Sequence, residues 1–278
     1  MMKPLLSSDA LSVFYDGIFA SPRLAHPEGV AVHPDGSVWA GTETGNLIRI
    51  AADGKSAEGI VTSDGFLLGI AFDAAGNCYA CDMKHAAIYK YDVQAGTFTN
   101  FASAGITVPN YPVIDDKNNY LYVSDSYNFD EQGGGVFRYD LSTGEGGLWT
   151  QTPMNFANGM AMAADGKGLY VVESSKAQVS FVPIKEDGTA GVHEVVVEGL
   201  DVIPDGVLVM DNGDLLISNY EPSRIYRHSK SKGLELLVED KLATILAHPT
   251  NIALKDGNLV TSNLGRWHIS HVDLSDLI

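Results

Sequence analysis

One phrase recurs six times along the chain: a polar opening residue, an alternating strand, a D-x-G-like turn and a second strand. EGVAVHPDGSVWAGT and NGMAMAADGKGLYVVES are two of the copies. The copies open at Glu28, Leu68, Asn110, Asn158, Asp205 and Asn251. These positions are 40 to 48 residues apart, which is the length of a four-stranded propeller blade. The repeat therefore predicts an all-β, six-bladed β-propeller, and we expect residues 1–278 to form a single propeller domain.

The two ends of the chain complement each other. The sixth copy stops after its third strand, HISHVDL, whereas LSVFYDG precedes the first copy and has no partner of its own. We predict that this N-terminal strand completes the last blade, because closing the ring removes two exposed strand edges.

The opening residues of the six copies are predicted to form a ring. In a propeller the first strand of each blade is innermost, so equivalent opening positions meet beside the central channel. Five of the six are oxygen donors, and buried carboxylates and amides are costly unless they are paired or bind a metal. The predicted metal ligands are Glu28, Asn110, Asn158 and Asp205. This hard-oxygen set favours Ca²⁺, with Mg²⁺, Mn²⁺ or Zn²⁺ as alternatives; the competing interpretation is a hydrogen-bonded ring that holds the blades together.

The loops between second and third strands should lie at the same end as the ring. Together with one ring residue they supply the predicted substrate pocket: Asn251, His85, Tyr127, Phe129, Tyr220, Trp267 and His268. The loop SDSYNFDEQGGG is the longest, and it is either a cover over the pocket or a plain surface loop. His85, His248 and His268 could act as general bases, although a loop histidine is more often an ordinary polar residue.

Charge and composition limit the partners. The chain has 18 Lys and Arg residues against 35 Asp and Glu residues, a net charge of −17. We therefore expect neither nucleic acid nor a membrane surface as a partner, but a small molecule. The first residues lack the apolar core of a secretory signal, and Cys78 and Cys81 are expected to be one core and one surface residue, so we expect a reducing, cytoplasmic location. Nothing in the sequence specifies an oligomeric state.

The motifs around these positions resemble the gluconolactonase family, which includes regucalcin and luciferin-regenerating-enzyme-like proteins. Diisopropyl-fluorophosphatase and paraoxonase propellers are more distant relatives. The resemblance spans almost the whole chain and is carried by HPEGVAV, VPNYPVID, FANGMAMAADGKGLYVVES, IPDGVLV and HPTNIAL. It implies that Glu28, Asn158 and Asp205 bind the metal, and that Asn110 either ligates it or touches substrate. Sugar-lactone hydrolases of the family often have arginine where this chain has Val108, so we expect a less polar substrate.

The resulting hypothesis is a metal-dependent hydrolase of a lactone or related ester. The metal would polarise the carbonyl, and water would attack with Asp205 as the first choice of base and Glu28 as the second. No G-x-S-x-G motif is present, which argues against a serine nucleophile. The alternatives are a phosphotriesterase-type hydrolase, a non-catalytic propeller that binds a small molecule or protein around a structural metal, and a metal-free condensing enzyme of the strictosidine-synthase type. The intact donor ring argues against the last.

Overall fold

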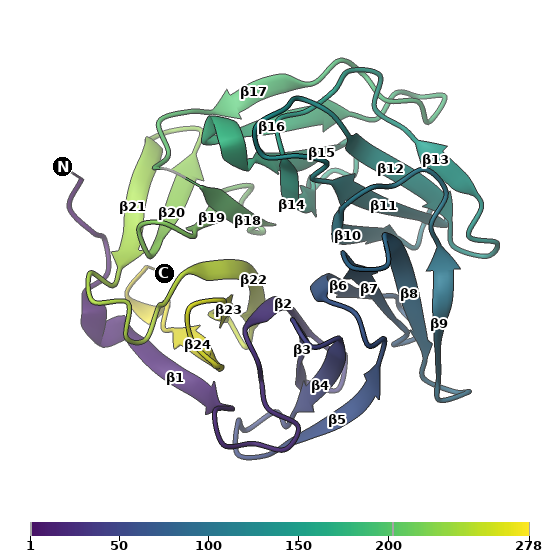
Figure 1. The fold of residues 1–278 in the computed structure, drawn as a ribbon. Helices are drawn as coiled ribbons and strands as arrows, with labels where there is room; N and C mark the ends of the chain where they lie inside the picture. Colours follow the sequence, from purple (N-terminus) through teal and green to yellow (C-terminus); the bar gives the residue numbers. More distant parts are fainter. Residues whose placement is uncertain (1, 202, 278) are drawn as a thin grey trace.

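The computed structural model describes residues 2–201 and 203–277. Within these residues, six four-stranded antiparallel sheets are arranged as blades around a common axis (Figure 1). This confirms the predicted six-bladed β-propeller. No helix in the described part of the chain has the length and apolar character needed to cross a membrane.

Each of the first five blades is built from four consecutive strands, the first being innermost. Blade one has β2 (Pro27–Val32), β3 (Val38–Thr42), β4 (Asn46–Ile50) and β5 (Ala57–Thr62). Blade two has β6 (Leu67–Phe72), β7 (Cys78–Asp82), β8 (Ala87–Asp92) and β9 (Thr97–Ala102). Blade three has β10 (Pro109–Asp115), β11 (Tyr120–Asp125), β12 (Gly135–Asp140) and β13 (Gly146–Leu148). Blade four has β14 (Ala157–Met162), β15 (Gly168–Glu173), β16 (Gln178–Pro183) and β17 (Glu194–Val197). Blade five has β18 (Pro204–Val209), β19 (Leu215–Asn219), β20 (Arg224–Ser229) and β21 (Gly233–Glu239).

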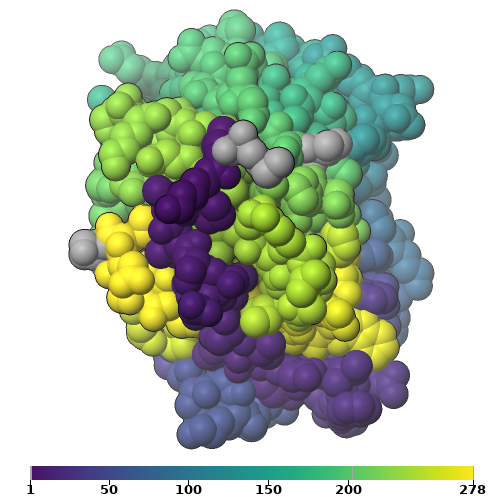
Figure 2. Space-filling view, turned by 90° about the vertical axis from the view of Figure 1, so that its left-hand side faces the viewer, coloured from purple at the N-terminus to yellow at the C-terminus, as the bar shows by residue number. Residues whose placement is uncertain are grey.

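Blade six joins the two ends of the chain, as predicted. It consists of β22 (Pro249–Lys255), β23 (Asn258–Asn263), β24 (His268–Val272) and the N-terminal β1 (Leu11–Asp16), which pairs with β24. Just before β1, the backbone N–H groups of Leu5 and Leu6 donate to carbonyls of β21, each at 2.9 Å. The N-terminal segment thus lies across blades five and six (Figure 2). Single 3₁₀ turns occur at η1 (Ser8–Ala10), η2 (Ser174–Lys176) and η3 (Ser275–Leu277).

Deleting residues 1–17 should unfold the protein or make it aggregate. The deletion removes β1 and the buried side chains of Leu6 and Leu11, which pack into the core of blades five and six. Burying an aliphatic side chain of this size stabilises a fold by about 1.5–3 kcal/mol, and the deletion also exposes the edge of β24. Thermal unfolding and size-exclusion chromatography measure the effect, with deletion of residues 1–3 as the control. An unchanged melting temperature for the longer deletion would contradict this closure.

The inner strands are buried on both faces, because every blade packs between two neighbours. All residues of β3, β7 and β19 are buried. The expectation that one of Cys78 and Cys81 lies at the surface is therefore wrong: both are buried and neither forms a disulfide. Alternation along a strand separates two faces, but in a propeller both faces of the second strand are core.

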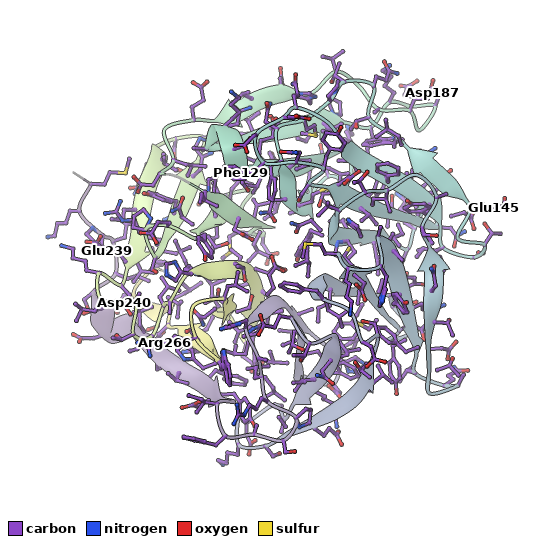
Figure 3. All side chains as sticks on the ribbon, in the orientation of Figure 1. Phe129, Glu145, Asp187, Glu239, Asp240 and Arg266 are labelled. Atoms are coloured by element: carbon purple, nitrogen blue, oxygen red, sulfur yellow. The ribbon has the colours of Figure 1, made fainter. Side chains whose placement is uncertain are left out.

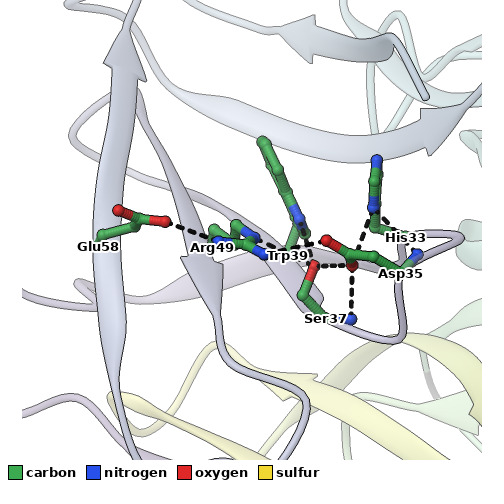
Figure 4. A network of polar contacts seen from close by, with 6 residues as sticks. All are labelled: His33, Asp35, Ser37, Trp39, Arg49 and Glu58. Atoms are coloured by element: carbon green, nitrogen blue, oxygen red, sulfur yellow. Dashed lines mark hydrogen bonds and ion pairs between the residues drawn. The ribbon is translucent and has the colours of Figure 1, made fainter. Parts of the chain in front are cut away.

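A polar network ties blade one together at the end opposite the ring (Figure 4). Arg49 of β4 lies between Asp35 in the β2–β3 turn and Glu58 of β5, with nitrogen–oxygen distances of 2.9 Å to both. The indole N–H of Trp39 in β3 donates to Ser37 Oγ in the same turn at 2.9 Å. Three strands are thus joined at this end, while the other end carries the candidate site.

Candidate functional site

All six innermost strands contain the same irregularity at the ring. In blade one the pairing shifts by one residue between Pro27, opposite Thr42, and Val30, opposite Ala40. The innermost strands of the other five blades shift at the same place. A bulge of this kind redirects a side chain. The residues at its first position are Glu28, Leu68, Asn110, Asn158, Asp205 and Thr250; we call them the ring.

The sixth member of the ring differs from the sequence-based expectation, which placed Asn251 there. Strand register puts Thr250 at the equivalent position, and Asn251 occupies the place of the glycine that follows the ring residue in most blades. The Thr250 hydroxyl donates to the Glu28 carbonyl at 2.8 Å, so it links blades six and one. Asn251 still reaches the ring, because its Nδ2 lies 3.5 Å from Asp205 Oδ1.

Glycine after the ring residue lets neighbouring blades come close. A Cβ at Gly159 would lie 2.5 Å from the Asp205 carbonyl oxygen. A Cβ at Gly29 would overlap the Leu68 carbonyl in the same way. The EG and NG pairs of the repeat are therefore explained by backbone contact between blades, which brings consecutive ring residues together.

Two ring asparagines are each oriented by a serine relay, in which a serine hydroxyl accepts from the amide and donates to a backbone carbonyl of the next blade. Asn110 Nδ2 donates to Ser126 Oγ at 3.0 Å, and this hydroxyl donates to the Ala157 carbonyl at 2.9 Å. In the next blade, Asn158 Nδ2 donates to Ser174 Oγ at 3.0 Å, and Ser174 donates to the Pro204 carbonyl at 2.6 Å. Because each amide nitrogen is used in this way, each amide oxygen is left for another partner.

The ring and the neighbouring Asn251 leave several buried oxygen atoms without a hydrogen bond. Among the described residues, Glu28 Oε2, Asn110 Oδ1 and Asn158 Oδ1 have no partner, and neither does Asn251 Oδ1. These side chains are buried, with at most 4% of each residue exposed. Leaving such atoms unpaired costs about 1–3 kcal/mol each, and carboxylate and amide oxygens are ligands that a hard divalent cation prefers. The residues present therefore fit such a cation.

The pKa values of the two ring carboxyl groups, those of Glu28 and Asp205, are both raised. Burial, followed by the charge of Asp205, raises the pKa of Glu28 well above its usual range. Burial also raises the pKa of Asp205 to about 7, although a hydrogen bond from Asn158 opposes the shift. Both groups would be stabilised as carboxylates by a nearby positive charge. No cluster of three His, Cys, Asp or Glu side chains suited to a metal occurs in the described part of the chain; the ring instead combines two carboxylates with amides.

Carboxylates at the ends of second strands hold the segments above the ring. Asp125 accepts from the N–H groups of Thr107 and Val108 at 3.1 and 2.7 Å, and Glu173 accepts from the Asn155 N–H at 2.8 Å. Each carboxylate thus fixes the segment that leads into the innermost strand of its own blade. The sequence shows these residues at the ends of YLYVSD and GLYVVE, but their role was not predicted.

These segments place one residue per blade two positions before the ring. We call this set the rim: His26, Phe66, Val108, Phe156, Ile203 and His248, all partly buried. Four of them have left-handed backbones, with φ values of 38° at His26, 56° at Phe156, 64° at Ile203 and 53° at His248. The rim is apolar over blades two to five and carries histidines over blades one and six. Of these six residues, only Val108 and His248 were indicated by the sequence.

Three predicted pocket residues contact the rim, and a fourth lies on the same loop as one of them. Phe129 contacts the Phe156 ring edge-on at 5.2 Å between centroids, and Trp267 contacts His26 at 5.5 Å. Phe129 lies inward of the outer-margin residues Glu145 and Asp187 (Figure 3). Tyr220 packs against His248 at 4.6 Å, and Tyr127 is 41% exposed on the same loop as Phe129. That loop is anchored to Met154 by the Gly133 N–H, at 3.0 Å.

Two predicted histidines are committed to other contacts. His268 is buried, and its Nε2 lies 2.7 Å from the Ile245 carbonyl oxygen. Burial also lowers its pKa, so His268 is not a solvent-facing base. His85 Nδ1 lies 3.0 Å from the buried carboxylate of Asp82. Asp82 lies only three residues before His85, so that contact is local, whereas the contact of His268 with Ile245 joins positions 23 residues apart that no motif in the sequence connects.

The family model described as SMP-30/Gluconolactonase/LRE-like region matches residues 43–261. The chain belongs to this family. A second model, strictosidine synthase-like, N-terminal, matches residues 19–50, which include Glu28. No curated protein matches the chain.

Several solved structures have the same fold as the chain. A gluconolactonase from Xanthomonas campestris is 17% identical, with a TM-score of 0.77 over 94% of this chain and 88% of the other. A regucalcin from Agrobacterium tumefaciens, described as a calcium-binding protein, is 13% identical, with a TM-score of 0.72 over 90% and 92% of the two chains. The nidogen/laminin complex contains a chain that is 17% identical, with a TM-score of 0.70 over 83% and 85%. At these identities the likeness is one of fold.

Proposed function

We propose that this member of the SMP-30/gluconolactonase/LRE-like family is a divalent-metal-dependent hydrolase of a lactone or related ester. The observation that supports the proposal most is the buried ring, in which unpartnered oxygens of Glu28, Asn110 and Asn158 accompany the perturbed carboxyl of Asp205. Membership of a family that includes gluconolactonases supports the lactonase class.

Four ring residues would hold the cation. The amide oxygens of Asn110 and Asn158 are oriented by their serine relays, and Glu28 and Asp205 add two negative charges. Ca²⁺ fits this all-oxygen set best, and the similar regucalcin is described as calcium-binding. Mg²⁺, Mn²⁺ and Zn²⁺ are the alternatives that metal analysis would distinguish.

The same residues account for hydrolysis. A bound cation would polarise the substrate carbonyl and stabilise the negative charge that develops on its oxygen. Asp205 is the proposed base that takes a proton from the attacking water, and Asn251 and Asn158 hold its carboxylate. Glu28 is the second candidate for that role.

The rim indicates the substrate class. Phe66, Val108, Phe156 and Ile203 offer no hydrogen-bonding side-chain atom to a sugar hydroxyl, and a hydroxyl desolvated without a partner is costly. Phe129 extends this surface beside Phe156, and Tyr220 lies next to Ile203, whose carbonyl accepts the Tyr220 N–H at 2.9 Å. We therefore propose an apolar or aryl-substituted lactone or ester as the substrate.

Activity on a lactone and ester panel tests both parts of this proposal. We expect kcat/KM to be at least about tenfold higher on alkyl lactones than on gluconolactone, since one well-buried methylene alone is worth about 10- to 200-fold. Chelation should abolish activity, and Ca²⁺ should restore it. Val108→Arg should lower the ratio of kcat/KM on alkyl lactones to kcat/KM on gluconolactone, with Val108→Ala as the matched control.

Each contrary result has a distinct meaning. A higher kcat/KM on gluconolactone than on every alkyl lactone would reject the apolar substrate class. Hydrolysis of phosphotriesters alone would favour a phosphotriesterase. Activity that survives chelation would point to metal-free chemistry, and no turnover of any substrate would favour a binding propeller.

A further inference from the structure

The rim is polar only above the carboxylate side of the ring. Asp205 belongs to blade five and Glu28 to blade one, and blade six lies between them. The rim residues of blades six and one are the two histidines, His248 and His26. A titratable side chain on this side would lie beside the groups that handle water in the proposed reaction.

His248 is fixed in place by several independent contacts. Its backbone is left-handed, with φ 53°, and its N–H donates to Ser223 Oγ at 3.0 Å. Its imidazole packs on the Tyr220 side chain, with 4.6 Å between the two ring centroids and 32° between their planes. Gly265 lies against the edge of the imidazole, where a Cβ would collide with His248 Cδ2. A surface histidine without a role needs no such support.

The hydrogen bonds of His248 determine which nitrogen exchanges protons. Nδ1 lies 3.0 Å from the Tyr220 carbonyl oxygen, and because a carbonyl only accepts, Nδ1 carries a hydrogen and donates it. Glu221 Oε2 lies 3.2 Å from the same Nδ1, so a carboxylate also faces this edge of the imidazole. Nε2 has no partner among the described residues, and 32% of the side chain is exposed. Nε2 is therefore the atom that can give a proton to a ligand.

Two neighbours link His248 to Asp205. Tyr220, on which the imidazole packs, is close enough to Asp205 that the carboxylate charge, after burial, helps to raise the pKa of Tyr220. Asn251, three residues after His248, reaches Asp205 Oδ1 with its Nδ2 at 3.5 Å. His248 thus stands over the Asp205 side of the ring.

We propose that His248 is a further catalytic residue, the general acid that protonates the leaving oxygen of the lactone or ester. This role rests on the proposed hydrolase function. The water hydroxyl bonds to the acyl carbon, and the water proton goes to the Asp205 carboxylate. The acyl carbon–oxygen bond then breaks, its electron pair goes to the leaving oxygen, and that oxygen takes the proton from Nε2 of the imidazolium. Asp205 returns its proton to the neutral imidazole through solvent, so one ester and one water yield one acid and one alcohol.

The leaving group provides the test. A nitrophenolate departs without protonation, whereas an alkoxide needs a proton. In His248→Gln loaded with Ca²⁺, kcat/KM on an alkyl lactone should fall about 100- to 10,000-fold, while kcat/KM on a nitrophenyl ester should change little. Glu221→Gln should also lower kcat/KM on the alkyl lactone, but by a smaller factor. His193→Gln is the matched control and should affect neither substrate, because His193 is a partly buried histidine beside the outer strand of blade four that contacts Thr152.

Further outcomes separate this role from a structural one. Gly265→Ala keeps the imidazole but displaces it, so it should reproduce the selective loss on the alkyl lactone even if His248→Gln folds poorly. An equal loss on both substrates, or no loss on the alkyl lactone, would overturn the role of His248 and leave the hydrolase function standing. A wild-type protein that hydrolyses neither substrate would overturn the hydrolase function, and the role of His248 with it.

Discussion

Asp205→Asn is expected to lower turnover about 100- to 10,000-fold, the contribution of a general base, while the protein stays folded. Asparagine keeps the shape of the side chain and one oxygen donor but removes its basicity and charge. Asp205 is buried, and burial raises its pKa to about 7, so a neutral amide is tolerated there. The measurements are kcat at saturating Ca²⁺ and Ca²⁺ affinity by titration calorimetry.

Asn158→Ala is the matched variant, because it removes a ligand but no base. It should weaken Ca²⁺ affinity, and excess Ca²⁺ should restore part of the activity. Ser174 keeps its acceptor at the Pro204 carbonyl in this variant, so the relay loses one bond only. Near-normal turnover in Ca²⁺-saturated Asp205→Asn would reduce Asp205 to a ligand and make Glu28 the leading candidate for the base.

Glu28→Gln should abolish stabilisation by Ca²⁺. A ligand that binds only the folded state stabilises it by about 2.7 kcal/mol at a hundred times its dissociation constant, so chelation should lower the melting temperature of the wild type and Ca²⁺ should restore it. In the metal-free protein the substitution should not destabilise the fold, since it replaces a carboxyl whose charge burial disfavours. Thermal unfolding with and without Ca²⁺ measures both effects.

Glu43→Gln controls for the loss of a carboxylate at the same end of blade one. Glu43 is about one-third exposed and pairs with His26 at 2.7 Å, and such exposed pairs contribute about 0–1 kcal/mol. Its Ca²⁺ response should match the wild type. If chelation changes nothing and elemental analysis finds no metal in the wild type, the ring is a hydrogen-bonded network between blades.

Spacing in the sequence was enough to predict the blades and their closure. A copy of the repeat every 40 to 48 residues reflects local chemistry, since strand alternation and D-x-G turns are properties of short segments. The unpaired strand LSVFYDG was predicted to pair with the last blade because the sixth copy lacks a fourth strand and closure removes exposed edges, and it does pair there. The ring residues of blades one to five also follow from repeat register alone.

The positions of the site residues depend on contacts between separate segments, and the spacing of motifs along the sequence does not specify those contacts. Thr250 rather than Asn251 occupies the ring, because a bulge sets the register where the sixth copy lacks the usual glycine. The serines that orient Asn110 and Asn158 act through carbonyls of the next blade.

The rim residues, too, are brought together by the tertiary structure rather than by sequence spacing. Four of them precede a proline, in HP, VP and IP pairs, but strand-end carboxylates and left-handed backbones help to place them at the mouth. The sequence by itself thus determined which strands form and in what order they surround the axis. Only the tertiary structure decided which side chains meet at the mouth, because packing between blades fixes those positions.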